Sequence, residues 1–128
     1  MLTIVVVGRN DDYGRDFRER LFRTALHNSA FLQFSGIDFE YILGEWNPLP
    51  GRPPLSEEFV ARVPNARAVI IPPELHRKYS LNPQMPFHEM AAKNAALRRA
   101  RGDHVIVTNA DILFSEAIVQ RLAAGGLR

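Results

Sequence analysis

The 128-residue sequence predicts an α/β fold, an open and mostly parallel sheet of about four strands with helices on both faces, in a Rossmann-like arrangement. Two observations predict it. Short apolar runs that read as strands alternate with segments of helical periodicity, and the runs are continuous, as in strands buried on both faces. The length suits a single domain spanning residues 1–128, and 46% apolar with 23% charged residues is typical of a globular protein.

The first strand and helix follow directly from the N-terminus. Leu2–Val7 is a continuous, largely β-branched run. Turn-forming residues follow it and lead to a helix expected over 16–28, where apolar residues recur at helical spacing. Asp16 is the expected N-cap of this helix. Residues 38–44 read as the second strand.

The middle of the chain is expected to hold a loop, a short helix and a strand. Residues 47–54 contain four of the nine prolines, which favours a loop. Ser56 is the expected cap of a short helix that turns three residues inward: Phe59, Val60 and Val63. Residues 66–71 read as a third strand that two prolines stop.

The last third of the chain begins with a polar stretch, 74–86, which we expect to be a loop. Apolar periodicity predicts a helix over 88–101, and a fourth strand follows over 105–107. Ser115 is the expected cap of a final helix over 116–123.

Polar side chains gather where three of the predicted strands end. In parallel sheets, ligands bind at the carboxyl edge of the strands, so these residues are candidates for one shared site. They are Arg9, Asn10, Asp11 and Asp12 after the first strand, Glu45 and Asn47 after the second, and Asn109 and Asp111 after the fourth.

Four segments together resemble glycosyltransferases of the GT-A type, similar to the family-2 enzymes. They are GRNDDYG at 8–14, Glu45-Trp46-Asn47-Pro48, the helical segment 89–94 and Asn109-Ala110-Asp111. The resemblance runs from Leu2 to about Leu122 and implies that the chain is a truncated or minimal nucleotide-sugar-binding domain. It departs from the family at Asn109, which stands in place of the first aspartate of the D-x-D motif.

The resemblance implies a specific set of site residues. Glu45 would face the base, and Asn109 would accept a hydrogen bond from a ribose hydroxyl. Asp111 would be the principal ligand of Mg²⁺ or Mn²⁺, hard cations that need only one or two protein carboxylates beside a diphosphate. We therefore expect Glu45 and Asp111 to open onto one cleft. The implied nucleotide-sugar-binding residues are Gly8, Arg9, Asn10, Glu45, Lys93, Asn94 and Asn109.

Several of these residues also have an ordinary structural interpretation. Asp111 can belong to the turn before the final helix, Glu45 to a solvated rim and Lys93 to a charged helix surface. Trp46 is expected to be a packed aromatic rather than a base-stacking one. The four histidines lack the spacing of a metal cluster.

The expected partners are a UDP- or GDP-sugar and a carbohydrate or other hydroxyl acceptor. Because GT-A enzymes are longer, the acceptor half is expected to be absent, and the chain reads as a fragment or a short homologue. Two alternatives stay open: a nucleotide-binding or assembly module without turnover, and a nucleotidyltransferase-like enzyme. A second copy of the chain is a candidate to cover the open sheet edge, giving a homo-oligomer.

Composition and charge exclude several other classes. The net charge is only +2 and the basic residues are dispersed, so a nucleic-acid-binding module is not expected. The absence of cysteine excludes disulfides, thiol catalysis and cysteine-based zinc sites. No apolar stretch approaches the roughly 18 residues of a membrane helix, and the N-terminus lacks a basic leader, so a cytoplasmic location is expected.

Overall fold

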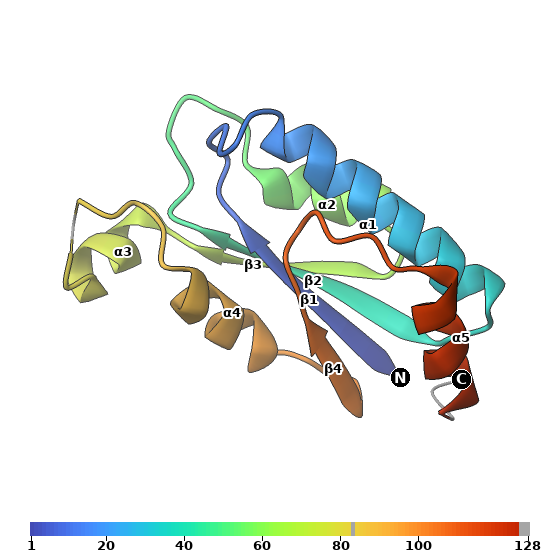
Figure 1. The fold of residues 1–128 in the computed structure, drawn as a ribbon. Coiled ribbons are helices and arrows are strands. Elements are labelled where there is room, and N and C mark those ends of the chain that lie inside the picture. The colour runs from blue at the N-terminus through green and yellow to red at the C-terminus, as the bar shows by residue number, and fades with distance from the viewer. Residues whose placement is uncertain (83, 126–128) are drawn as a thin grey trace.

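The computed structural model describes residues 1–82 and 84–125, and it confirms the parallel α/β fold (Figure 1). Four strands form one sheet in the order β3-β2-β1-β4, and every pair of neighbours is parallel. The strands are β1 (Leu2–Gly8), β2 (Phe39–Trp46), β3 (Ala66–Ile71) and β4 (His104–Val107).

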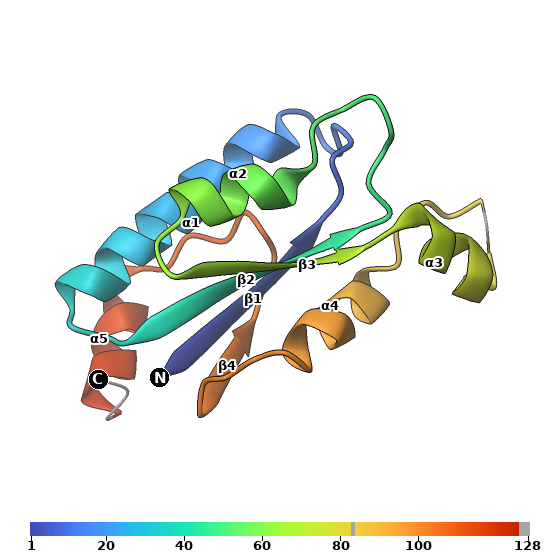
Figure 2. The same ribbon diagram turned by 180° about the vertical axis from the view of Figure 1, so that it is seen from behind.

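Helices cover both faces of the sheet. Helices α1, α2 and α5 pack on one face, α4 packs on the other, and α3 lies beyond the end of β3 (Figures 1 and 2). The helices are α1 (Phe17–Phe34), α2 (Leu55–Arg62), α3 (Pro73–Tyr79), α4 (Glu89–Leu97) and α5 (Glu116–Ala124). None of the helices in the described part of the chain is long and apolar enough to cross a bilayer.

The two faces of the sheet are packed differently. The face under α1 and α2 carries the larger core, in which Tyr41 and Phe59 are fully buried with their rings 5.8 Å apart. On the other face, α4 approaches closely through the small residues Ala92 and Ala96. A Cβ on Gly44 of β2 would lie 3.0 Å from the carbonyl oxygen of Ala92, so glycine permits this approach.

The strand order creates a switch point beside β1. The chain moves from β1 through β2 to β3 in one direction, and α4 then carries it back across the sheet to β4 on the opposite side of β1. Because connections of this kind are right-handed, α4 lies on the face opposite α1 and α2. The carboxyl ends of β1 and β4 therefore border a crevice of the type in which α/β proteins bind ligands.

Helix α1 is six residues longer at its C-terminal end than the sequence predicts. Its extension carries the buried residues Ser29 and Leu32, whose packing overrides a weak local pattern. The predicted cap is also wrong: Asp16 precedes the helix, but it adopts a left-handed conformation with φ of 52° and makes no side-chain capping hydrogen bond.

Helix α2 starts one residue before Ser56, and Pro54 occupies its N-cap position, so the predicted serine cap is wrong. Glu45 of β2 binds the free amides of its first turn instead. The inward face is partly as predicted, because Phe59 and Val63 are buried, whereas Val60 is 50% exposed.

Most of helix α3 lies in the stretch 74–86, which was predicted to be a loop. Pro83, in the same stretch, is outside the described residues. Pro73 fixes the first helical position, and the buried His76 anchors the helix. Helix α4 ends at Leu97 instead of 101, because the next amides bond to carbonyls three residues back: Arg99 to Ala96, and Ala100 to Leu97.

Candidate functional site

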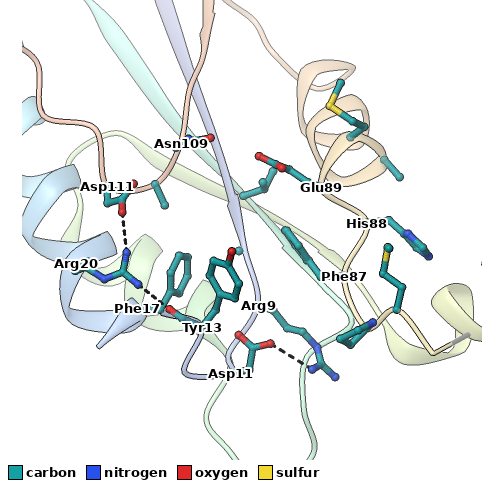
Figure 3. Close-up of a pocket in the computed structure, with 17 residues that line it drawn as sticks. Arg9, Asp11, Tyr13, Phe17, Arg20, Phe87, His88, Glu89, Asn109 and Asp111 are labelled. Atoms are coloured by element: carbon teal, nitrogen blue, oxygen red, sulfur yellow. Dashed lines mark hydrogen bonds and ion pairs between the residues drawn. The ribbon is translucent and has the colours of Figure 1, made fainter. Parts of the chain in front are cut away.

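A cleft of about 800 Å³ lies at the carboxyl edge of the sheet, where β1 and β4 end (Figure 3). It is lined by residues 7–9, 11, 13, 17, 20, 85–91 and 109–111, from three separate segments of the chain. Small-molecule sites have volumes of roughly 300–1,000 Å³. The cleft therefore has the size and the topological position of a ligand site.

Gly8 and Arg9, two of the predicted site residues, line the cleft. A Cβ on Gly8 would lie 2.5 Å from Cε1 of Phe17, so only glycine lets α1 pack against the end of β1. The guanidinium of Arg9 donates from Nε to the carbonyl oxygen of Asn47 at 2.7 Å and pairs with Asp11 at 3.4 Å. These contacts fix a cation in the lining of the cleft.

Arg20 of α1 joins two sides of the cleft. Its Nη1 donates to Oδ2 of Asp111 at 2.7 Å, and its Nη2 donates to the carbonyl oxygen of Tyr13 at 2.6 Å (Figure 3). Its Nε donates to the carbonyl oxygen of Arg15 at 3.0 Å. Arg15 and the neighbouring Gly14 are both left-handed, so Arg20 supports an unusual backbone conformation in this loop.

The turn that carries Asp111 is held by a buried amide. Asn28 of α1 is fully buried; its Oδ1 accepts from the main-chain N–H of Phe114 at 2.8 Å, and its Nδ2 donates to the carbonyl oxygen of Ile112 at 3.0 Å. Ala110 is buried, while Asn109 and Asp111 are exposed toward the cleft. The structure thus places both polar residues of the predicted D-x-D counterpart in the cleft.

The opposite wall is the segment that runs into α4. The side chain of Asn47 donates to the carbonyl oxygen of Pro86 at 3.0 Å and fixes this segment to the end of β2. Phe87 and Glu89 face the cleft across from Tyr13 (Figure 3). Aromatic surface on both walls offers places for a flat ring to stack.

The prediction that Glu45 faces a bound base is wrong for this structure. The side chain of Glu45 is 0% exposed and does not line the cleft. Its Oε2 accepts from the N–H of Leu55 at 2.7 Å, and its Oε1 accepts from the N–H and hydroxyl of Ser56 at 3.0 and 2.7 Å. Glu45 caps α2 and does not open onto the cleft that Asp111 lines, so the expectation that the two residues share one cleft is wrong.

Asn10 is likewise structural rather than exposed to the cleft. It is buried, and its Oδ1 accepts from the N–H of Leu49 at 2.5 Å. Its Nδ2 donates to the carbonyl oxygens of Leu49 and Arg52. It holds the proline-rich loop against the end of β1, which makes it a support for Arg9 and not a wall of the cleft.

Lys93 and Asn94 also lie outside the cleft lining. Lys93 pairs with Glu89 at 2.7 Å, one helical turn earlier on α4, and so reaches the cleft only through Glu89. Asn94 is exposed on α4. Of the eight predicted site residues, the structure brings four together in the cleft: Gly8, Arg9, Asn109 and Asp111.

Arg20 and Phe87 line the cleft but were not predicted from the sequence. Arg20 lies inside a helix whose surface carries several arginines, and no local pattern separates it from them. Only the tertiary contact with Asp111 identifies it. Phe87 falls between the predicted loop over 74–86 and the predicted helix over 88–101, where its aromatic ring was the one available signal.

The cleft is lined by three carboxylates and two arginines, with a slight excess of negative charge: Asp11, Glu89 and Asp111 against Arg9 and Arg20. Within residues 1–82 and 84–125, no cluster of three or more histidine, cysteine or acidic side chains forms a ready metal cage. Asp111 and Asn109 each bring an oxygen-bearing side chain to the lining of the cleft. This set fits a hard cation only when a ligand completes the coordination.

Comparison with known proteins assigns no family to the chain. A scan of protein-family models finds no match, and a search of curated protein sequences finds none either.

Proposed function

We propose that the cleft binds a nucleoside diphosphate sugar together with Mg²⁺ or Mn²⁺, and that the chain is the donor-binding part of a glycosyltransferase. The observation that carries the proposal is the meeting of Arg9, Arg20, Asn109 and Asp111 in one cleft at the switch point of a parallel sheet. Glu45 has no part in it. We assign base recognition to the aromatic side chains of the two walls, Tyr13 and Phe87.

The ion pairs in the cleft favour a ligand that carries both signs of charge. Arg20 is paired with Asp111, and Arg9 with Asp11. A diphosphate alone would meet the arginines but also the excess of carboxylates. A diphosphate with a divalent cation gives Arg20 an anion and Asp111 a cation, so this pair is exchanged without leaving either charge unpaired, and Arg9 can meet the anion while it keeps its longer 3.4 Å pair with Asp11.

The magnitudes favour this exchange. A solvent-exposed ion pair such as Arg20–Asp111 contributes about 0–1 kcal/mol. A hydrogen bond to a charged group contributes about 1.5–3 kcal/mol. Replacing one weak internal pair with several charge-assisted contacts to phosphate oxygens and a cation is therefore favourable overall.

Asp111 and Asn109 would hold the cation on the side of the cleft that faces α1. When bound, such an ion stabilises the negative charge that develops on a diphosphate leaving group. Arg9 and Arg20 would orient the phosphates from fixed positions, because each guanidinium is also bound to main-chain carbonyls. This arrangement holds a donor in place; the acceptor stays unassigned.

Isothermal titration calorimetry with UDP and GDP, with and without Mn²⁺, tests the proposal. We expect Mn²⁺ to tighten binding at least tenfold, or about 1.4 kcal/mol, and Asp111→Asn to remove this gain. Asp38→Asn is the matched control, because Asp38 is an exposed carboxylate at the opposite edge of the sheet. Equal affinity with and without Mn²⁺, or no binding at millimolar concentration, would contradict the proposal.

A nucleotide-binding module without turnover is the second candidate. The observation that favours it is that Asp111 is already neutralised by Arg20 and has no ready metal cage among the described residues. Slow hydrolysis of UDP- or GDP-sugar by the isolated chain distinguishes the two, because the transferase predicts release of free sugar and the module predicts none. Release of pyrophosphate from a nucleoside triphosphate would instead indicate a nucleotidyltransferase.

A further inference from the structure

A cluster of two histidines and the single tryptophan lies at the α4 wall of the cleft, to which His88 belongs. The ring of Trp46, at the end of β2, lies 5.8 Å from that of His76 on α3 and 5.6 Å from that of His88. The two imidazoles are 5.3 Å apart. Trp46 and His76 are buried. The proposed function uses none of the three rings.

The hydrogen bond between Trp46 and His76 fixes the protonation state of His76. The indole Nε1 donates to Nδ1 of His76 at 2.9 Å. Because an indole nitrogen can only donate, Nδ1 must be unprotonated and the neutral ring carries its proton on Nε2. A second proton would enter at Nδ1 and would face the indole N–H, so protonation of His76 breaks this bond.

The surroundings of His76 oppose its protonation. Burial and then three cationic or basic groups lower the pKa of His76: His88 before α4, Arg9 from the segment after β1, and Arg77 on α3 itself. The acidic residue of the same helix, Glu74, is exposed and is directed to Arg77 at 3.7 Å. The neutral ring is thus the form that fits the folded protein.

The cluster is connected to the cleft through Asn47, the residue after Trp46. Asn47 has a left-handed backbone with φ of 48°; its carbonyl oxygen accepts from Arg9, and its side chain donates to the carbonyl oxygen of Pro86. His88 is held as well by Ser80, the residue that follows α3, whose hydroxyl is 2.7 Å from its ring nitrogen Nε2 in a hydrogen bond. Movement of Trp46 or His88 therefore changes the support of Arg9 and of the α4 wall.

We propose that Trp46, His76 and His88 form a proton-sensitive clamp, in which protonation of His76 releases Trp46 and loosens both Arg9 and the wall formed by residues 85–91. The clamp is closed above the ordinary histidine pKa of about 6.5. Since the folded-state pKa of His76 is lowered, the unfolded chain binds the proton more readily. The clamp weakens as pH falls below about 6.5, and its release is complete below the lowered pKa.

Nuclear magnetic resonance of the complete chain tests the clamp without any ligand. The protein has one tryptophan, so its indole N–H gives a single signal that reports directly on the bond to His76. Between pH 8 and pH 5 we expect this signal to shift upfield in one step, with a midpoint below 6.5 that coincides with the midpoint of the His76 ring signals. The amide signals of Arg9 and of residues 85–91, where a residue has an amide proton, should move with the same midpoint.

Variants separate the clamp from general acid sensitivity. His76→Gln should abolish the step, and His88→Gln should raise its midpoint, because one opposing charge is removed. His27→Gln, a change at an exposed histidine on α1, should leave the step in place. The proposal is overturned if the indole signal does not respond, if the step survives in His76→Gln, or if the amides of Arg9 and 85–91 titrate independently. Should His76→Gln not fold, the midpoints of the indole and the His76 ring in the unmodified protein still decide: separate midpoints overturn the clamp.

Discussion

Replacing Glu45 with glutamine tests the most consequential difference between the sequence and the structure. The carboxylate accepts three hydrogen bonds at the start of α2, two of them from the main-chain amides of Leu55 and Ser56. In glutamine, the –NH₂ group must occupy one of the two oxygen positions, and in either orientation it faces a buried main-chain N–H. Loss of the charge and one unsatisfied buried donor together should cost about 2–4 kcal/mol of unfolding free energy. With a urea dependence of about 2 kcal/mol per molar, the midpoint should fall by about 1–2 M.

Urea denaturation followed by circular dichroism measures this loss, and Glu89→Gln is the control. Glu89 lines the cleft and forms a half-exposed ion pair with Lys93, so its substitution should change the unfolding free energy by less than about 1 kcal/mol. If Glu45→Gln kept the midpoint of the unmodified protein and weakened nucleotide binding instead, Glu45 would face a ligand and the reasoning from the structure would be refuted.

Two further substitutions test the packing of β1 and the pH dependence of stability. Gly8→Ala places a methyl group 2.5 Å from the ring of Phe17 and should cost about 1–3 kcal/mol, measured by thermal denaturation; an unchanged melting temperature would contradict this close approach. At Glu40, burial works toward a higher pKa, but hydrogen bonds from the N–H of Arg101 and from Arg67 outweigh it and lower the pKa. Its contribution to stability is therefore present above about pH 4.5 and is lost as pH falls through the lowered pKa. Glu40→Gln should flatten the acid side of the stability profile, and an unaltered slope there would disprove the assignment.

The strands were the most predictable part of the fold. All four parallel strands follow from apolar runs, and β3 has the predicted bounds, although only β1 and β2 are buried along their whole length as the continuous runs had indicated. Helix ends were less predictable. The start of α2 depends on Glu45, ten residues earlier in the chain, and no local capping pattern contains that information.

The candidate site was half predictable for a related reason. Topology alone brings the ends of β1 and β4 together, so Arg9 and Asp111 were found from the sequence. Arg20 enters the cleft from a helix, and Asn28 holds the turn of Asp111 from below. Both act through contacts between segments that are about 80 or more residues apart, which periodicity and motif spacing do not encode.

The error at Glu45 has a simple geometric cause, which also explains why the clamp was missed. Successive side chains of a strand point to opposite faces. Tyr41 and Leu43 belong to the core under α1 and α2, so Glu45, in phase with them, must point to that same face. Trp46, out of phase with them, must point to the face of α4, where it meets His76 and His88. From the sequence, this strand was predicted to cover residues 38–44, with Glu45 and Asn47 after its end. When β2 is extended by two residues, Glu45 belongs to the core and Trp46 to the face of α4. The position of the strand end therefore determines that Glu45 cannot contact a ligand in the cleft and that Trp46 bonds to His76.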